Sequence, residues 1–482
     1  MSNTPGSIDT EASHNPFSRG MMTLEKGQEC LDMFRSRMSP HFPFVMIHES
    51  VTIQSLAQDK PALCVAVLAA SCHHDRRLQQ ELGKLFNEIV VVRMVKGPFA
   101  TLDMLQGLLV HLAWPRIASL WALSRENKHA SGEMTHDEQR ALAGTYYLSS
   151  SSAVLLQKSH HFRYSPYILE CCHKLITKGS FPTDRHLPYI IYLQKLTEEV
   201  DDAVTEATGT IRTPRQAQLP AELQRIRERY TTTKSSLPFP LSESPTILLQ
   251  LHVLDLIICQ PSPDGISYGP NGFQSLQQGA DQNRFLDWLS QSMSAAKSLI
   301  SVVLVLPQGE EDSMPNIGWI MLYCAVSLAV RLDLVAAQPE NAQTAGHLRR
   351  ILDMSHTLRQ IVLRMEAALG PDMSDAESSP YWDFARRARR IERWYLERCG
   401  PAESPEMGSL FTSSQVSLAN PFSGADMGLD SSSFQDANMV PSLQITGEPD
   451  PEPWMTDLLA DLDVDHGMEN LLFTGPFDFL GN

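Results

Sequence analysis

Two pairs of neighbouring histidines have the residue types of a metal site. His73 and His74 are followed by Asp75, and His160 stands next to His161. Imidazole nitrogen and carboxylate oxygen both bind zinc, so each pair resembles part of a ligand set. Adjacent side chains on a helix point about 100° apart, however, and such a pair seldom chelates one ion. We therefore interpret these histidines as ordinary residues at helix ends or on the surface, and we predict no metal and no cofactor.

The usual signatures of enzymes are missing from the sequence. It contains no G-x-G-x-x-G or G-x-x-x-x-G-K-[ST] loop, no G-x-S-x-G elbow and no H-E-x-x-H motif. Asp461-x-Asp463-x-Asp465 begins like a calcium loop, but His466 and Leu472 stand where that loop needs Gly and Glu. We predict that the protein is not an enzyme.

The eight cysteines are scattered, mostly within apolar segments, and form no C-x-x-C pair. The adjacent Cys171 and Cys172 make a poor beginning for a zinc site, so reduced thiols in an intracellular protein are the expected state. The N-terminus is polar through Arg19 and lacks the apolar core of a secretory signal.

Basic residues gather in one run, which contains Arg386, Arg387, Arg389 and Arg390. Apolar residues interleave with the arginines at helical spacing, which predicts an amphipathic helix docked on the body of the protein. Its arginine face is consistent with a solvated surface, with pairing to acidic neighbours, or with a nuclear import signal. Direct contact with DNA is the least favoured of these interpretations.

The acidic residues concentrate at the C-terminus. The chain of 482 residues has a net charge of −17, and no Lys or Arg follows Gly400. The first 400 residues hold all 39 basic groups and 42 of the 56 acidic ones, so a nearly neutral body carries an acidic tail. This charge argues against nonspecific binding of the whole chain to nucleic acid or to anionic membranes.

The tail, residues 399–482, mixes acidic residues with bulky apolar ones. This composition is typical of a disordered activation domain, which binds partners through transiently helical segments. The predicted partner-binding residues are Trp454, Met455, Leu458, Leu459, Leu462, Leu471, Leu472, Phe473, Phe477 and Phe479. Burial of one Trp and two or three Leu side chains contributes roughly 6–9 kcal/mol, and ordering the segment costs about 2–5 kcal/mol of it. The small net free energy predicts weak, reversible binding to a coactivator. The alternative interpretation is a solubilising tail that carries an apolar patch.

The rest of the chain is dominated by helical periodicity. Apolar residues recur at spacings of three and four over residues 102–112, 190–204 and about 346–369. Thr101 is a plausible N-cap for the first of these helices. Period-two strands are scarce, and we interpret the β-branched residues 90–92 and 301–306 as helix ends. The fourteen apolar residues of 317–330 are too few to span a bilayer of about 30 Å, so we predict a buried helix there.

These patterns predict an all-α protein with three parts. Residues 1–23 form a disordered N-terminus, residues 24–398 an all-helical domain, and residues 399–482 a disordered acidic tail. Loops within the helical domain are expected near residues 207–220, 231–245 and 261–280, where Pro, Gly, Ser, Thr and Gln are abundant.

Several short motifs of the first third resemble those of a known family. In order along the chain they are Phe34-Arg35-x-Arg37-Met38-x-Pro40-x-Phe42-Pro43-Phe44-Val45, Lys60-Pro61-x-Leu63, Ala69-Ala70-Ser71, Leu82-Gly83, Leu102-Asp103-x-Leu105-x-Gly107-Leu108-Leu109-Val110 and Trp114. Farther on, Trp319, Leu322, Ala325 and Arg331-Leu332 match a later helix. Together these residues resemble the regulatory domain, or middle homology region, of fungal binuclear-zinc-cluster transcription factors, over roughly residues 30–335.

The resemblance implies a nuclear regulator of transcription, frequently one that controls a secondary-metabolite gene cluster, and often a homodimer or heterodimer. It carries no catalytic residue to this chain. The family's DNA-binding unit needs six closely spaced cysteines before this domain, whereas only Cys30 precedes Cys64. We therefore expect either a truncated zinc-cluster factor or a cofactor that acts through a DNA-bound regulator without contacting DNA itself. The pair Ile47-His48 is a minor departure, because the family often has Pro at the second position.

Overall fold

The computed structural model describes residues 15–96, 101–114, 134–156, 162–178, 181–207, 218–259, 280–339, 341–368 and 380–399. Every regular element in these ranges is a helix, which confirms the all-α prediction. All of the described residues fall in one compact unit. Residues 400–482 of the acidic tail, with all ten predicted partner-binding residues, lie outside the described residues.

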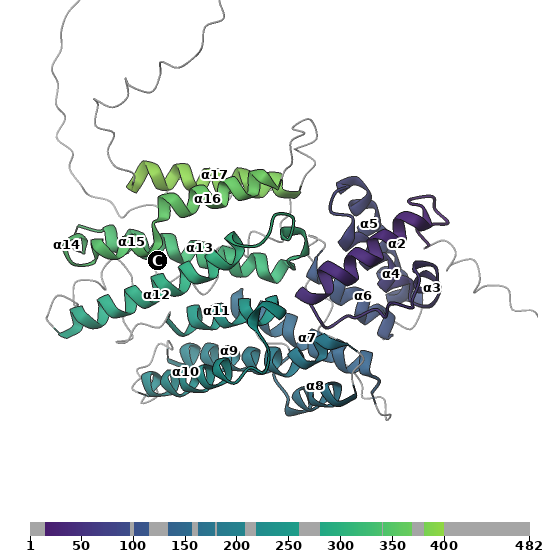
Figure 1. The fold of residues 1–482 in the computed structure, drawn as a ribbon, viewed down its shortest axis with the longest axis horizontal. Coiled ribbons are helices and arrows are strands. Elements are labelled where there is room, and N and C mark those ends of the chain that lie inside the picture. The colour runs from purple at the N-terminus through teal and green to yellow at the C-terminus, as the bar shows by residue number, and fades with distance from the viewer. Residues whose placement is uncertain are drawn as a thin grey trace, which may run out of the picture. The chain divides into compact units, whose positions relative to one another are not determined.

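The first group of helices surrounds one apolar helix (Figure 1). Its members are α2 (Leu24–Met33), α3 (Ile53–Asp59), α4 (Pro61–Ser71), α5 (Arg76–Lys96) and α6 (Leu102–Ala113). α4 contacts the other four, and each of its residues from Ala62 to Ser71 is buried. A helix that is apolar on all sides is stable in water only when neighbours cover it all round. Gly107 lets α6 come close to α4, because a Cβ there would lie 3.0 Å from the carbonyl carbon of Ala62.

The remaining helices pack one upon the next (Figure 1). They are α7 (His136–Leu155), α8 (Pro166–Lys178), α9 (Leu187–Ala207), α10 (Leu219–Ser235), α11 (Pro245–Cys259), α12 (Ala280–Leu304), α13 (Asn316–Ala337), α14 (Ala342–Ala345), α15 (Arg349–Leu352), α16 (Met354–Ala367) and α17 (Pro380–Cys399). α10 packs on α9, α9 on α11, α11 on α12 and α12 on α13, while α16 pairs with α17. α7 joins the two groups, since it contacts α6, α8, α9 and α13.

The two shorter predicted helices are confirmed, and so is the cap of the first. α6 covers residues 102–112, and the Thr101 hydroxyl accepts a hydrogen bond from the amide of Met104. α9 covers residues 190–204. The β-branched residues 90–92 are helical, as predicted, but lie inside α5 and not at its end; of residues 301–306, residues 301–304 end α12 and residues 305–306 follow it.

The predicted continuous helix over residues 346–369 is wrong. The segment is a 3-10 turn at Gly346–Leu348, then α15, then α16, with a break at Asp353, whose φ is +42°. Lys297 of α12 donates to the carbonyl of Leu352 at 3.0 Å and lies 2.6 Å from the Thr357 hydroxyl. The break is thus stabilised by a side chain of another helix, which periodicity does not reveal.

The predicted loop at residues 231–245 is also too long, because α10 continues to Ser235. The hydroxyls of Thr231, Thr232 and Thr233 donate to carbonyls four residues earlier, so these residues fit a helix despite their loop-like composition. At the other end of α10, Pro220 lies in the first helical turn, where its missing amide hydrogen costs nothing. The rest of the loops predicted near residues 207–220 and 261–280 lies almost entirely outside the described residues.

Order at the N-terminus begins before residue 24, the predicted start of the helical domain. The Asn15 side chain accepts hydrogen bonds from the amides of Phe17 and Ser18, which fixes a turn. The Phe17 ring packs against Gly27, where an added Cβ would lie 2.7 Å from the ring. This contact holds residues 15–22 against α2.

α13 is apolar enough to be mistaken for a membrane span. Its 22 residues are long and apolar enough to cross a membrane, and no other helix among the described residues meets both criteria. Its most apolar window is 61% buried, and it contacts α6, α7, α11 and α12 as well as α14 to α17. The prediction of a buried helix at residues 317–330 is confirmed.

Candidate functional site

The loop between α12 and α13, residues 305–315, is where the two groups of helices meet, and we call it the junction loop. Gly309 allows the loop to turn back, because its φ of +85° lies in the left-handed region that other residues rarely adopt. Arg37 donates a hydrogen bond to the carbonyl of Gly309. Arg364 of α16 donates to the carbonyls of Leu304 at 3.2 Å and Pro307 at 3.0 Å. The loop is therefore held from both groups.

Aromatic residues of the first group form a second attachment for the junction loop. The Trp114 indole donates to the carbonyl of Ser313 at 3.2 Å. Its ring meets the rings of Phe34 and Phe42 edge to face, with centroids 5.6 Å and 5.8 Å away. Asn316, the first residue of α13, donates to the carbonyl of Leu112 at 3.2 Å. The motif residues Phe34, Phe42 and Trp114 thus serve to anchor a distant loop.

Three consecutive acidic residues of the junction loop each face a basic partner. Glu310 lies 3.7 Å from His41 and 3.9 Å from Arg37. Burial lowers the pKa of His41, and the Glu310 carboxylate opposes that shift. The side chain of Glu311 is 2% exposed and lies 2.6 Å from Nε of Arg364. Asp312, the third, meets a pair of histidines.

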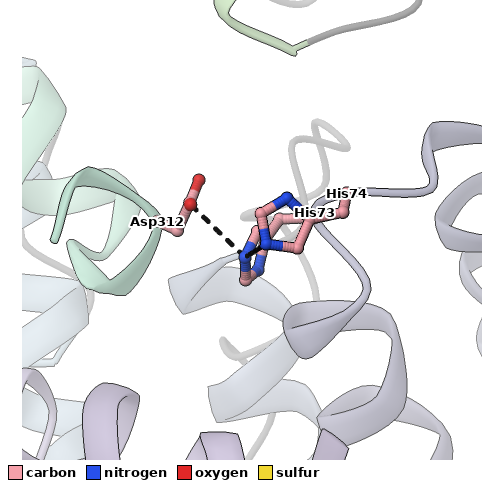
Figure 2. Close-up of side chains that lie close together, drawn as sticks. All are labelled: His73, His74 and Asp312. Atoms are coloured by element: carbon pink, nitrogen blue, oxygen red, sulfur yellow. Dashed lines mark hydrogen bonds and ion pairs between the residues drawn. The ribbon is translucent and has the colours of Figure 1, made fainter. Parts of the chain in front are cut away.

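His73 and His74 lie in the turn between α4 and α5 and point toward Asp312 (Figure 2). Their Nε2 atoms are 2.9 Å apart, and Nε2 of His73 is 3.3 Å from Oδ2 of Asp312. Burial lowers the pKa of His73 to about 4, with Asp312 acting in the opposite direction, so this imidazole is neutral at pH 7. One ligand atom from each residue fits within 4.8 Å of the other two.

This geometry differs from the one assumed in the sequence analysis. The argument that adjacent side chains diverge holds for a helix, whereas these two histidines follow the end of α4 at Ser71 and precede α5. In the turn their rings lie with centroids 4.0 Å apart. Asp75, which follows the two histidines in the sequence, accepts a hydrogen bond from the amide of Leu78 at the start of α5. The other pair, His160 and His161, lies outside the described residues.

Another motif residue of the first group, Arg35, forms hydrogen bonds to the backbone. Arg35 donates to the carbonyls of Ile47, His48 and Val51 at 3.2, 2.6 and 2.5 Å. The Arg35 guanidinium contacts the backbone carbonyl of His48. A Pro at position 48, as the family often has, would present the same carbonyl.

Asp103 and Lys60 of the same motifs tie α4 to α6 and α7. Asp103 accepts the amide of Leu63 at 2.9 Å, where α4 begins, and pairs with Arg93 at 2.9 Å. Lys60 donates to Gln106 at 2.9 Å and to Asp137 at 3.2 Å. Each of these contacts joins two helices, which is the structural role that the resemblance implies.

The arginines proposed for nuclear import lie on α17, which docks by one face as predicted. Tyr395 and Ala385 are buried on that face. Arg386 is exposed, and Arg389 is 51% exposed while its Nε lies 2.5 Å from Glu366 of α16. Arg390 is partly buried, and the side chain of Arg387 lies outside the described residues. The run is thus partly paired with acidic groups and partly solvated.

An ionic network holds α17 to α13 and α15. Asp333 is 1% exposed and accepts hydrogen bonds from Arg349 at 2.9 Å and from the Tyr395 hydroxyl at 2.6 Å. Hydrogen bonding to Asp333 raises the pKa of Arg349, and burial raises the pKa of Tyr395. Sequence reasoning missed this network, since the three residues belong to three separate helices.

Comparison with known proteins points to one class, fungal transcription factors. The chain is 29% identical over 419 residues to transcription factor himD of Aspergillus japonicus, which covers 79% of this chain and 68% of that protein. It is 20% identical over 414 residues to transcription factor opdL of Penicillium oxalicum, covering 77% and 71%. A transcription factor of Aspergillus terreus is 24% identical over 310 residues, covering 62% of this chain and 49% of that protein. No family profile matches the chain. No solved structure matches it.

These similarities agree with the resemblance to fungal transcription factors.

Proposed function

We propose that this protein is a nuclear regulator of transcription in which the helical body supports an acidic, apolar-rich segment that recruits other proteins. The observation that carries the proposal is the similarity, over 79% of the chain, to a protein named as a transcription factor. The roles of the family-like residues in this fold agree with it. Arg35, Lys60 and Asp103 hold the backbone or join helices.

The recruiting element is the tail, residues 399–482. Its apolar residues Trp454, Leu458 and Leu462 recur every four residues among Asp side chains, so one helical turn after another presents them on the same face. Their partner is a coactivator or a DNA-bound regulator, and the target is a secondary-metabolite gene cluster. The chain reaches DNA through such a partner, alone or as a dimer, since its own net charge is −17.

The test is a fusion of residues 400–482 to a heterologous DNA-binding domain with a reporter gene. We expect activation by the native segment and loss of most of it when Trp454, Leu458 and Leu462 are changed to Ala. A matched control changes Leu410, Val416 and Leu418 of the same segment, which lie away from the acidic cluster, and should retain activity. A native fusion that is silent, or a triple variant as active as the native one, contradicts the mechanism.

The second element of the proposal is nuclear import through α17. Changing the exposed Arg386 and Arg389 to Ala should shift a fluorescent fusion of the full chain from the nucleus toward the cytoplasm. Arg225 of α10 is also exposed, and its change to Ala serves as the control for loss of a surface charge. Unchanged nuclear accumulation of the double variant would remove α17 from the mechanism.

In this proposal the chain reaches DNA through a partner, whereas a zinc-cluster factor would bind the promoter by itself. We expect occupancy of a target promoter by the full chain in cells to disappear when the DNA-bound partner is deleted. Tight binding of the purified chain to that promoter, without any partner, would contradict it.

A further inference from the structure

We propose that His73, His74 and Asp312 bind a divalent transition-metal ion, with zinc as the reference case. The three side chains come from two segments far apart in the sequence and converge on one point (Figure 2). One donor atom from each lies within 4.8 Å of the other two. The proposal does not depend on the transcriptional role, because it rests on the geometry of these residues alone.

The donor spacing is close to that of a zinc site. Two ligands at about 2.0–2.1 Å from a tetrahedral ion stand roughly 3.3 Å apart. Nε2 of His73 is 3.3 Å from the Asp312 carboxylate and 2.9 Å from Nε2 of His74. The third pair of donor atoms, on His74 and Asp312, lies within 4.8 Å. Binding of the ion therefore requires a shift of the His74 side chain, which is the exposed member of the three.

The site is fixed on one side and open on the other. The side chains of His73 and Asp312 are 9% and 14% exposed. The junction loop that carries Asp312 is held by the hydrogen bonds of Arg37 to Gly309 and of Trp114 to Ser313. Exposure of His74 leaves an entry path and room for water as a fourth ligand, which is the pattern of zinc sites with three protein ligands.

The donor set selects the class of ion. Two imidazole nitrogens and one carboxylate suit zinc, nickel, copper or iron, whereas calcium and magnesium prefer oxygen ligands alone. The adjacent thiol of Cys72 is directed elsewhere, since its Sγ lies 3.7 Å from Sγ of Cys30. The site is thus one of nitrogen and oxygen, without sulfur.

A bound ion would fasten the α4–α5 turn of the first group to the junction loop of the second. A ligand that binds only the folded state raises its stability in proportion to the logarithm of ligand excess. Metal availability would then set how firmly the two groups of helices are joined, which gives the fold a means of responding to the ion.

The experiment uses the purified full chain, stripped with a chelator and titrated with Zn²⁺ by calorimetry. Because the sequence holds 16 His and 8 Cys, zinc can also bind elsewhere on the chain. The quantity compared is therefore the difference in bound zinc between wild type and variant, and not the total zinc bound. His74→Gln is the principal variant, because an exposed side chain can be changed without loss of the fold. We expect it to lose one equivalent of bound zinc, or to bind that equivalent at least tenfold more weakly, and to lose the zinc-dependent rise in thermal midpoint.

Asp312→Asn is the second variant and should have the same effect. His347→Gln is the control, since His347 is exposed and lies in the 3-10 turn that follows α14. Co²⁺ in place of Zn²⁺ should give visible absorption bands in the wild type that His74→Gln removes. Identical zinc titrations for the wild type and His74→Gln, or an equal loss in His347→Gln, overturn the proposal. If Asp312→Asn fails to fold, His74→Gln decides alone.

Discussion

The first and the last helices of the described body are held by different chemistry. In the first group α4 is buried on every side, and the rings of Phe34 and Phe42 meet the Trp114 ring edge to face, while the charged groups lie at the N-terminal end of α4. At the other end α17 is fixed by the buried carboxylate of Asp333, which accepts from Arg349 and Tyr395. Apolar packing depends on the fit of neighbouring side chains, whereas removing one member of a buried ion pair leaves the other charge uncompensated. The two ends should therefore respond differently to substitution.

The largest effect is expected at the ionic end. Arg349→Met leaves the Asp333 carboxylate buried without its cation, which costs about 3–5 kcal/mol of unfolding free energy at pH 7. Urea unfolding followed by circular dichroism measures the loss.

The double variant Asp333→Leu with Arg349→Met is its control. Removing both charges leaves no unpaired ion, although the buried Tyr395 hydroxyl then loses its acceptor, which costs about 1–3 kcal/mol. The double variant should therefore regain part of the stability that Arg349→Met loses, and adding Tyr395→Phe should restore more. A triple variant as unstable as Arg349→Met would contradict the role of charge pairing in holding α17.

The second effect is a pH dependence of stability that we expect from the buried His111 in the first group of helices. His111 is 4% exposed and stacks on Phe86 with centroids 4.4 Å apart. Burial lowers its pKa to about 4, against about 6.5 in the unfolded chain. The folded state thus keeps His111 neutral while the unfolded state takes up a proton, so its stabilising contribution is complete above pH 6.5 and is lost as the pH falls toward 4.

The size of this loss is on the order of 3 kcal/mol over that interval. The variant His111→Gln cannot titrate, so its unfolding free energy should fall less than that of the wild type between pH 7 and pH 4.5. Parallel curves for the two proteins would mean that His111 does not experience an apolar surrounding.

The smallest effect tests how tightly the apolar end is packed. A Cβ at Gly144 would lie 2.6 Å from Cβ of Phe44, which is a backbone-proximal atom that cannot swing away. Overpacking costs about 1–3 kcal/mol of unfolding free energy, and the higher helix propensity of Ala offsets up to about 1 kcal/mol of that cost. Gly144→Ala should therefore destabilise the protein by about 1–2 kcal/mol. Gly346→Ala is the control, because nothing lies within 4 Å of its added Cβ. Thermal midpoints of the two variants give the comparison, and similar midpoints would show a looser core.

The sequence predicted the parts of the fold that local patterns determine. The periodicity of residues 102–112 and the cap at Thr101 correctly gave α6, and the apolar run 317–330 correctly gave a buried helix. It could not give the break at Asp353, because the stabilising group is Lys297 of another helix. The end of α10 was also predicted wrongly. Its composition favours a loop, whereas the hydroxyls of Thr231, Thr232 and Thr233 donate to backbone carbonyls within the helix.

The candidate metal site shows the same limit. His73 and His74 were visible as a pair, but whether they diverge depends on the backbone between α4 and α5. Asp312 becomes their neighbour only through the junction loop, whose position depends on Gly309, Arg37 and Trp114. Long-range contacts of this kind leave no spacing pattern in the sequence.

The apolar character of α13 has a consequence for the synthesis of the chain. Trp319 packs against the small apolar cluster that Met365 of α16 and Ala385 of α17 form, and the ribosome makes these helices later. Until those helices emerge, a face of α13 stays in water, and exposed surface of this kind is what chaperones bind and what aggregates. Translation that stops shortly after residue 340 should therefore yield an insoluble product, whereas a stop just after Cys399 should yield a soluble one.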